Sequence, residues 1–123
     1  MSVASILRSS AILGGSGVVL GAFGAHYLKG TLEVRGTTEA WKTGVFYQIV
    51  HSVALLTLAL SEKSKDRDGK YTTVANLWTA GILLFSGSIY GLSLGGPRLL
   101  GPITPIGGLL LIGGWFQLYR AAI

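Results

Sequence analysis

The distribution of charge constrains this chain more than any other feature of its sequence. Most charged residues fall in two short stretches, 29–42 and 62–70, and long apolar runs separate them. Only 12% of all residues are charged, whereas about 25% is usual in a soluble domain. Since a run of about 20 apolar residues is long enough to cross a bilayer as a helix, the pattern predicts an integral membrane protein.

Four apolar runs predict four membrane-spanning helices, over roughly residues 8–28, 41–61, 73–94 and 105–120. Because the connections between them are short, consecutive helices are expected to run antiparallel. The predicted fold is therefore all-α, an integral membrane antiparallel four-helix bundle that forms one domain over residues 1–123. Both termini then share a side of the bilayer with 62–70, and a small excess of basic residues there favours the inside.

The connections carry signals for chain breaks and helix ends. Gly30 and Gly36 interrupt the stretch 29–42, which is predicted to be a loop, and 62–70 is predicted to be a solvated turn. Thr38 and Thr104 are expected to cap the helices that follow them.

Aromatic residues near the span ends are expected to lie at the lipid–water boundary, as is common for Trp and Tyr in membrane proteins. Trp41 begins the second span, and Trp115 and Tyr119 lie near the end of the fourth. Arg120 can extend from the same end toward water.

Glycines recur at helical spacing in three of the predicted spans. Small residues that share a helix face allow two backbones to approach closely in a membrane. The predicted helix-packing glycines are Gly17 and Gly21 in the first span, Gly87, Gly91 and Gly95 in the third, and Gly107 and Gly114 in the fourth.

A polar stripe interrupts the second span. Tyr47 and His51 are four residues apart and share a helix face, with Gln48 beside them. An ionisable residue inside a membrane is a candidate functional residue. The alternative interpretation is a neutral His51 that bonds a neighbouring helix, in one network with Gln48 and Tyr47.

The sequence disfavours several classes of chemistry. It has two histidines and no cysteine. At 1.5 Å per helical residue, His51 would lie roughly 15 Å deep in the membrane and His26 roughly 3 Å deep, so a shared metal ion or haem is not favoured. No acid lies inside a span, which disfavours an ion pump. We predict no catalytic residue, no cofactor, no metal site and no nucleic-acid partner.

Sequence blocks in all four spans resemble a known family. They are Gly21-Ala22-Phe23-Gly24-Ala25-His26, Thr43-Gly44-Val45-Phe46-Tyr47-Gln48 with His51, Leu84-Phe85-Ser86-Gly87-Ser88-Ile89-Tyr90, and Ile103-Thr104-Pro105-Ile106-Gly107-Gly108 with Gly114-Trp115. These blocks are similar to the transmembrane protein 256 family, also called the domain of unknown function 423 family.

The resemblance implies a small multi-span protein of bacterial inner membranes and eukaryotic organelles, mitochondria among them, with no established activity. It also implies that the family's signature residues are candidate site residues. Those that could be functional or packing polar residues are His26, Tyr47, Gln48, His51, Ser86, Tyr90 and Thr104.

Three functions are consistent with the sequence. The first is a non-enzymatic bundle that packs in lipid with other membrane proteins. It would be an accessory subunit of a larger complex, with a respiratory complex as one candidate, in the bacterial plasma membrane or the mitochondrial inner membrane. The alternative is a small transporter or channel whose path is lined by the polar stripe of the second span together with Ser86 and Tyr90. The third is a membrane enzyme or cofactor binder that uses His26 and His51.

Overall fold

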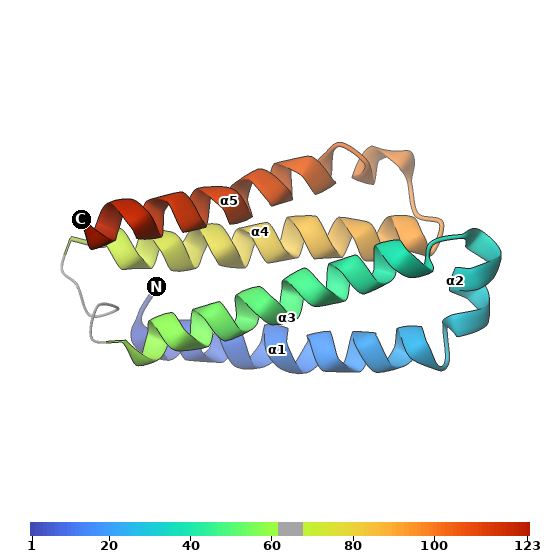
Figure 1. The fold of residues 1–123 in the computed structure, drawn as a ribbon, viewed down its shortest axis with the longest axis horizontal. Coiled ribbons are helices and arrows are strands. Elements are labelled where there is room, and N and C mark those ends of the chain that lie inside the picture. The colour runs from blue at the N-terminus through green and yellow to red at the C-terminus, as the bar shows by residue number, and fades with distance from the viewer. Residues whose placement is uncertain (62–67) are drawn as a thin grey trace.

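The computed structural model describes residues 1–61 and 68–123, and within these ranges it is helical with no strand. The long helices run antiparallel (Figure 1) and are α1 (Val3–Ala25), α3 (Thr38–Leu60), α4 (Lys70–Ser93) and α5 (Ile103–Ala122). A short helix, α2 (Lys29–Arg35), and a 3₁₀ turn, η2 (Arg98–Leu100), lie at one end of the bundle. Both termini lie at the other end (Figure 1). The predicted all-α fold is confirmed.

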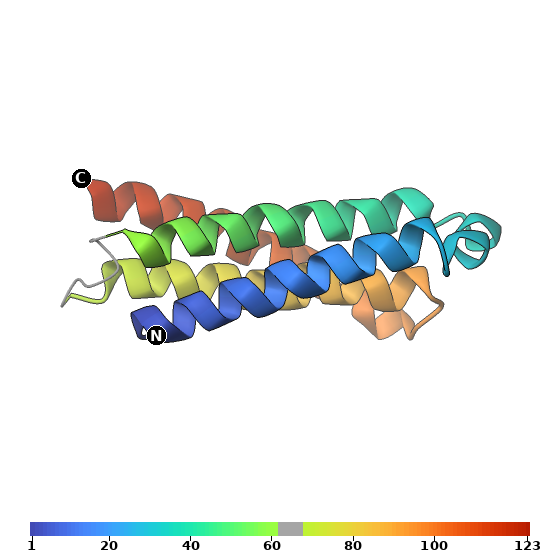
Figure 2. The same cartoon turned by 90° about the horizontal axis from the view of Figure 1, so that it is seen from below.

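Each long helix is long and apolar enough to cross a membrane. α1 packs along α3, α3 along α4, and α4 along α5, as Figures 1 and 2 show from two directions. The core of the bundle consists of Ile6, Leu13, Leu55, Leu58, Ala59, Tyr71, Val74, Ala75, Trp78, Ile82 and Leu111. The outer faces carry large exposed apolar side chains such as Val18, Phe46 and Leu109, as expected of a surface that lipid covers.

Glycines form the face of α1 that packs on α3. These glycines follow one another at intervals of three, four and three positions, and they are Gly14, Gly17, Gly21 and Gly24. A Cβ atom built on Gly17 would lie 2.8 Å from Ile49 Cγ1, and one built on Gly24 would overlap the indole ring of Trp41. The two helices are therefore closer than side chains at these positions would allow. Gly14 and Gly24 extend the interface beyond the pair that the sequence pattern indicated.

The contact between α4 and α5 uses glycines from both helices. A Cβ atom on Gly107 would overlap the backbone of Phe85, and one on Gly114 would overlap Trp78. Between them, Leu111 of α5 fills the space that Gly81 of α4 leaves open. Large and small residues thus alternate across this contact, which explains how two backbones meet without a void.

The three glycines predicted as a packing stripe of the third span do not share one partner within the described residues. Gly87 is exposed, and a Cβ atom built there would meet no atom within 4 Å. Gly91 faces only Leu100 of η2. Gly95 lies beyond the end of α4 with φ of 89°, a left-handed conformation that favours glycine, and the Arg35 guanidinium packs against it.

The predicted loop 29–42 is also wrong in part, because it contains α2 and the start of α3. Gly30 is accommodated in the first turn of α2, whereas Gly36 ends that helix with φ of 68°. Thr38 is not the cap of α3; that position belongs to Thr37. The Thr37 hydroxyl donates to the carbonyl oxygen of Ser93 at 2.9 Å, so it joins α3 to the end of α4.

Two further expectations are corrected. Thr104 lies inside α5, which begins at Ile103, and its hydroxyl pairs with Ser88 Oγ of α4 at 2.5 Å. Trp41 is 3% exposed, and its Nε1 donates to the carbonyl oxygen of Leu20 at 2.9 Å. It packs between helices because Gly24 leaves space for its ring. Residues 62–67 of the predicted solvated turn lie outside the described residues.

Candidate functional site

The side-chain amide of Gln48 links three helices. It is 3% exposed, and its Nε2 donates to the carbonyl oxygen of Leu13 at 2.8 Å and to Ser16 Oγ at 2.9 Å, both on α1. Its Oε1 accepts from the Tyr90 hydroxyl of α4 at 2.6 Å. Both ends of the amide are therefore paired, and α1 and α4 are joined across α3.

A glycine of α1 faces α3 beside Gln48. A Cβ atom on Gly17 would lie 2.8 Å from Ile49 Cγ1, which is too close, and 3.4 Å from Gln48 Nε2, which is an ordinary van der Waals distance. Gly17 therefore allows α3 to approach α1 at the position of Ile49. The Gln48 amide, one residue earlier on α3, reaches the Leu13 carbonyl oxygen in this close contact.

Two buried serines add hydrogen bonds to the same region. Ser86 Oγ of α4 donates to the carbonyl oxygen of Gly44 on α3 at 2.7 Å, and Ser52 Oγ donates to that of Gln48 at 2.6 Å. Ser86 and Tyr90 are one turn apart, so one face of α4 makes both contacts with α3. Gly44 permits this approach, because a Cβ atom there would lie 2.9 Å from the Tyr90 ring.

Both ring nitrogens of His51 are engaged by other groups of the chain. Nδ1 lies 2.8 Å from the carbonyl oxygen of Tyr47, and Nε2 accepts from Trp115 Nε1 of α5 at 3.0 Å. A carbonyl oxygen can only accept and an indole N–H can only donate. His51 must therefore be neutral, with its proton on Nδ1 and the Nε2 lone pair directed at Trp115.

Aromatic rings surround this histidine. Tyr47 stacks on it with ring centroids 6.1 Å apart, and the rings of Trp78 and Trp115 meet it edge-on at 6.1 and 5.8 Å. His51 is 4% exposed while Trp115 is 46% exposed. The Trp115 indole therefore covers the imidazole from the outer side of the bundle.

The structure brings most of the predicted site residues together around α3, but it separates His26 from them. His26 is exposed and follows the last residue of α1. It lies near Gly24, which packs on Trp41 of α3. Trp41 precedes His51 by ten residues on that helix. Ten helical residues span roughly 15 Å, so the two histidines do not share a site. Thr104 bonds α4 elsewhere in the bundle.

The arrangement suits cohesion between helices better than chemistry. Within residues 1–61 and 68–123, no three His, Asp or Glu side chains are placed to hold a metal ion. A metal or haem iron could bind His51 only by displacing Trp115 or the Tyr47 carbonyl. The hydrogen bonds of Gln48, His51 and Ser86 each join two helices or fix a side chain. Gln48 and His51 bond different partners, so they do not form the single network with Tyr47 that one interpretation of the polar stripe expected.

The partners of the stripe were not evident from the sequence. Trp115 was expected at the lipid–water boundary, and its bond to His51 depends on how α5 is aligned along α3. The two residues are 64 positions apart, and hydrophobic periodicity within one span carries no information on that alignment. The Leu13 carbonyl could not have been predicted as the partner of Gln48 either. Every residue has a backbone carbonyl, and the sequence does not show which one the Gln48 amide reaches.

The His51 tautomer can be tested directly. In ¹⁵N spectra of the protein in detergent micelles, with His51 identified by comparison with His51→Asn, we expect a protonated Nδ1 and an unprotonated Nε2 at neutral pH. Trp115→Phe removes the indole donor and should shift the Nε2 resonance while leaving Nδ1 protonated. A protonated Nε2 in the unmodified protein would contradict the hydrogen-bond assignment.

The chain is similar to several membrane proteins. It is 42% identical over 106 residues to the UPF0382 membrane protein YwdK of Bacillus subtilis, covering 86% of this chain and 85% of the relative. It is 39% identical over 120 residues to the UPF0382 inner membrane protein YgdD of Escherichia coli K12, covering 96% and 88%. It is 36% identical over 116 residues to the UPF0382 membrane protein C1782.12c of Schizosaccharomyces pombe, covering 90% and 95%. No solved structure matches the chain.

A family description also matches the region that contains the polar stripe. The family described as "Protein of unknown function (DUF423)" matches residues 20–108. This range includes Gln48 and His51 on α3 and Tyr90, the partner of Gln48 on α4. Together with the four apolar helices and the relatives named as membrane proteins, this match confirms the resemblance seen in the sequence blocks. The chain is a membrane protein of the DUF423 family.

Proposed function

We propose that this protein is a non-catalytic accessory subunit that packs against other proteins in a larger membrane complex. The complex would lie in the inner membrane of a bacterium or in the mitochondrial inner membrane of a eukaryote. One observation carries the proposal: Gln48 and His51, the polar residues deepest in α3, are fully engaged by groups of their own chain. Since these side chains are engaged, the outer surface of the bundle is the part of the protein that can contact a partner.

The small size of the elements outside the long helices supports this role. α2 has seven residues and η2 has three. Elements of this size can hold the ends of the bundle, but they offer little surface for a reaction in water. Association through the lipid-facing helices is the activity that most of the chain's surface can support.

The transporter alternative is less well supported by the same contacts. It needs Gln48, His51 and Tyr90 to face a path for substrate. Instead, the Tyr90 hydroxyl bonds the Gln48 amide and the His51 ring bonds Trp115. A substrate would have to displace these bonds, which also hold the helices together.

The outer face of α4 is suited to contact another helix. Its residues follow each other at intervals of three and four, and this α4 outer stripe consists of Thr73, Asn76, Ala80, Leu83 and Gly87. Gly87 leaves open space, where a neighbouring backbone can approach. Asn76 is exposed, and its side chain makes no hydrogen bond among the described residues. A polar amide that faces lipid gains when a second helix supplies a partner.

The test is the native size of the protein and its dependence on Asn76. After solubilisation of native membranes in a mild detergent, the tagged protein should migrate on blue-native gels in a complex with other polypeptides. Asn76→Leu should release at least threefold more free protein, because an interhelical hydrogen bond in a membrane contributes about 0.6–2 kcal/mol. Gln117→Leu, an amide replaced on α5, is the matched control and should leave the complex intact.

Two results would contradict the proposal. One is a wild-type protein that migrates only as a free monomer. The other is a larger species that contains this chain alone, because such a homo-oligomer would need no other subunit.

A further inference from the structure

A groove of about 430 Å³ opens on the outside of the bundle between the end of α1, the short helix α2 and the first half of α3. We call it the α1–α3 groove. Its walls are almost entirely apolar, and large side chains of α3 form one side, among them Val45, Phe46 and Val50. Phe46 is well exposed. The groove therefore faces lipid and not the interior of the bundle.

The groove exists because α1 has only small residues there. Gly21, Gly24 and Ala25 line it, and none of them has a side chain that reaches across to Phe46. Leu32 of α2 closes the end of the groove nearest the connecting segment. The same glycines that let α1 approach α3 thus leave a groove on the lipid-facing surface beside the contact.

The length of the groove corresponds to one leaflet of a bilayer. Along α3 it extends from Thr38, the first residue of the helix, to Val50. At 1.5 Å per residue, thirteen helical residues span roughly 20 Å, somewhat more than half of the ~30 Å hydrocarbon core. A groove of this length that begins at a helix end fits an extended acyl chain whose headgroup lies near Thr38.

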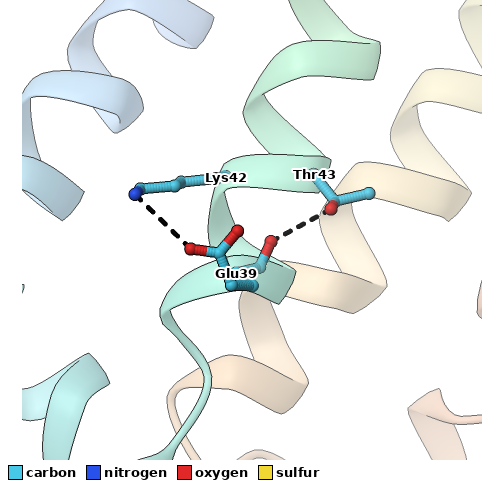
Figure 3. A network of polar contacts seen from close by, with 3 residues as sticks. All are labelled: Glu39, Lys42 and Thr43. Atoms are coloured by element: carbon cyan, nitrogen blue, oxygen red, sulfur yellow. Dashed lines mark hydrogen bonds and ion pairs between the residues drawn. The ribbon is translucent and has the colours of Figure 1, made fainter.

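The mouth of the groove lies at an end of the bundle that carries more basic than acidic residues. Lys42 lines the groove, and among the described residues its ammonium group pairs only with Glu39, at 3.5 Å (Figure 3). The Lys42 and Glu39 side chains are 69% and 89% exposed, so the pair is weak and can rearrange. This end of the bundle also carries Lys29, Arg35 and Arg98 against a single further acid, Glu33, so its charge complements an anionic headgroup.

We propose that the α1–α3 groove is a specific binding site for one phospholipid with an anionic headgroup. One acyl chain lies along Phe46 and Val50, and the phosphate lies within reach of Lys42. The bound lipid covers the apolar wall that α1 leaves open. This site is independent of the proposed subunit role and would be present in the isolated protein.

The experiment uses the full-length protein reconstituted in bilayers of equal parts phosphatidylcholine and phosphatidylglycerol. The protein is then transferred to detergent, and native mass spectrometry measures the lipids that it retains. The wild-type protein should retain one phosphatidylglycerol per chain. Ala25→Leu places a side chain in the groove at an exposed position and should abolish retention. Ala40→Leu, exposed on α3 outside the groove, should behave as the wild type does.

A second variant tests the headgroup contact without changing the groove. Lys42→Gln should lower the preference for phosphatidylglycerol over phosphatidylcholine by about fivefold, as expected from the loss of one basic residue near an anionic lipid. Arg8→Gln, at the opposite end of α1, is the charge-matched control and should leave the preference unchanged. Lys42 is exposed, so Lys42→Gln is expected to fold. This variant therefore still tests the lipid site if Ala25→Leu fails to fold.

Each remaining outcome would overturn the assignment. If the wild-type protein retains no lipid, or if Ala25→Leu retains as much as Ala40→Leu, the groove is not a lipid site. If Lys42→Gln keeps the full preference, the anionic headgroup is wrong. If the retained species is a protein dimer that Ala25→Leu dissociates, the groove binds a second copy of the chain.

Discussion

Replacing Gly107 by alanine should lower the free energy of unfolding by about 3 kcal/mol, at the upper end of the usual cost of overpacking. The new Cβ atom would overlap the backbone of Phe85, and a backbone cannot rotate away as a side chain can. α4 and α5 would have to separate, which would also loosen the contact of Gly114 with Trp78. The measurement is unfolding of the detergent-solubilised protein in SDS, followed by circular dichroism.

Gly113→Ala is the matched control, since Gly113 lies on the same helix with no atom within 4 Å of a built Cβ. There, alanine should be neutral or stabilise the protein by up to about 1 kcal/mol through its higher helix propensity. If the two variants unfold alike, the close contact between α4 and α5 is not what holds them together.

Replacing Gln48 by leucine should cost about 2–4 kcal/mol of the free energy of unfolding. Three interhelical hydrogen bonds are lost, and such bonds contribute about 0.6–1.7 kcal/mol each in membrane proteins. The Tyr90 hydroxyl also loses its acceptor inside the bundle. The same SDS unfolding measurement applies, with Gln117→Leu as the control for loss of an amide on another helix.

A double-mutant cycle separates the bond from the packing. Tyr90→Phe alone should cost about 1 kcal/mol, and it should cost much less when Gln48 is already leucine. Additive effects would show that the Tyr90 hydroxyl and the Gln48 amide do not interact as the structure indicates.

Helical periodicity predicted the polar stripe but not its role. Tyr47, Gln48 and His51 could be placed on neighbouring faces of one helix from their spacing alone. Whether they line a path or bond the neighbouring helices depends on Leu13, Tyr90 and Trp115. These residues come from three other helices, so their positions depend on how the helices pack.

Glycine spacing was informative only where the partner helix is adjacent. Gly17 and Gly21 face α3, and Gly107 and Gly114 face α4. Gly87 has the same kind of spacing but faces outward. A spacing of four shows that residues share a face, but it does not show whether that face meets another helix of the chain or its surroundings.

The sequence by itself determined the all-α membrane fold and the family, because the length and polarity of each apolar run are local properties and because the motif blocks are contiguous. It also indicated which residues of the second span are polar. The tertiary structure alone decided that Gln48 and His51 are paired within the chain, that α2 is a helix, and that the α1–α3 groove exists. Those features depend on the rotation and axial alignment of helices against one another, and packing between residues distant in the chain sets that alignment.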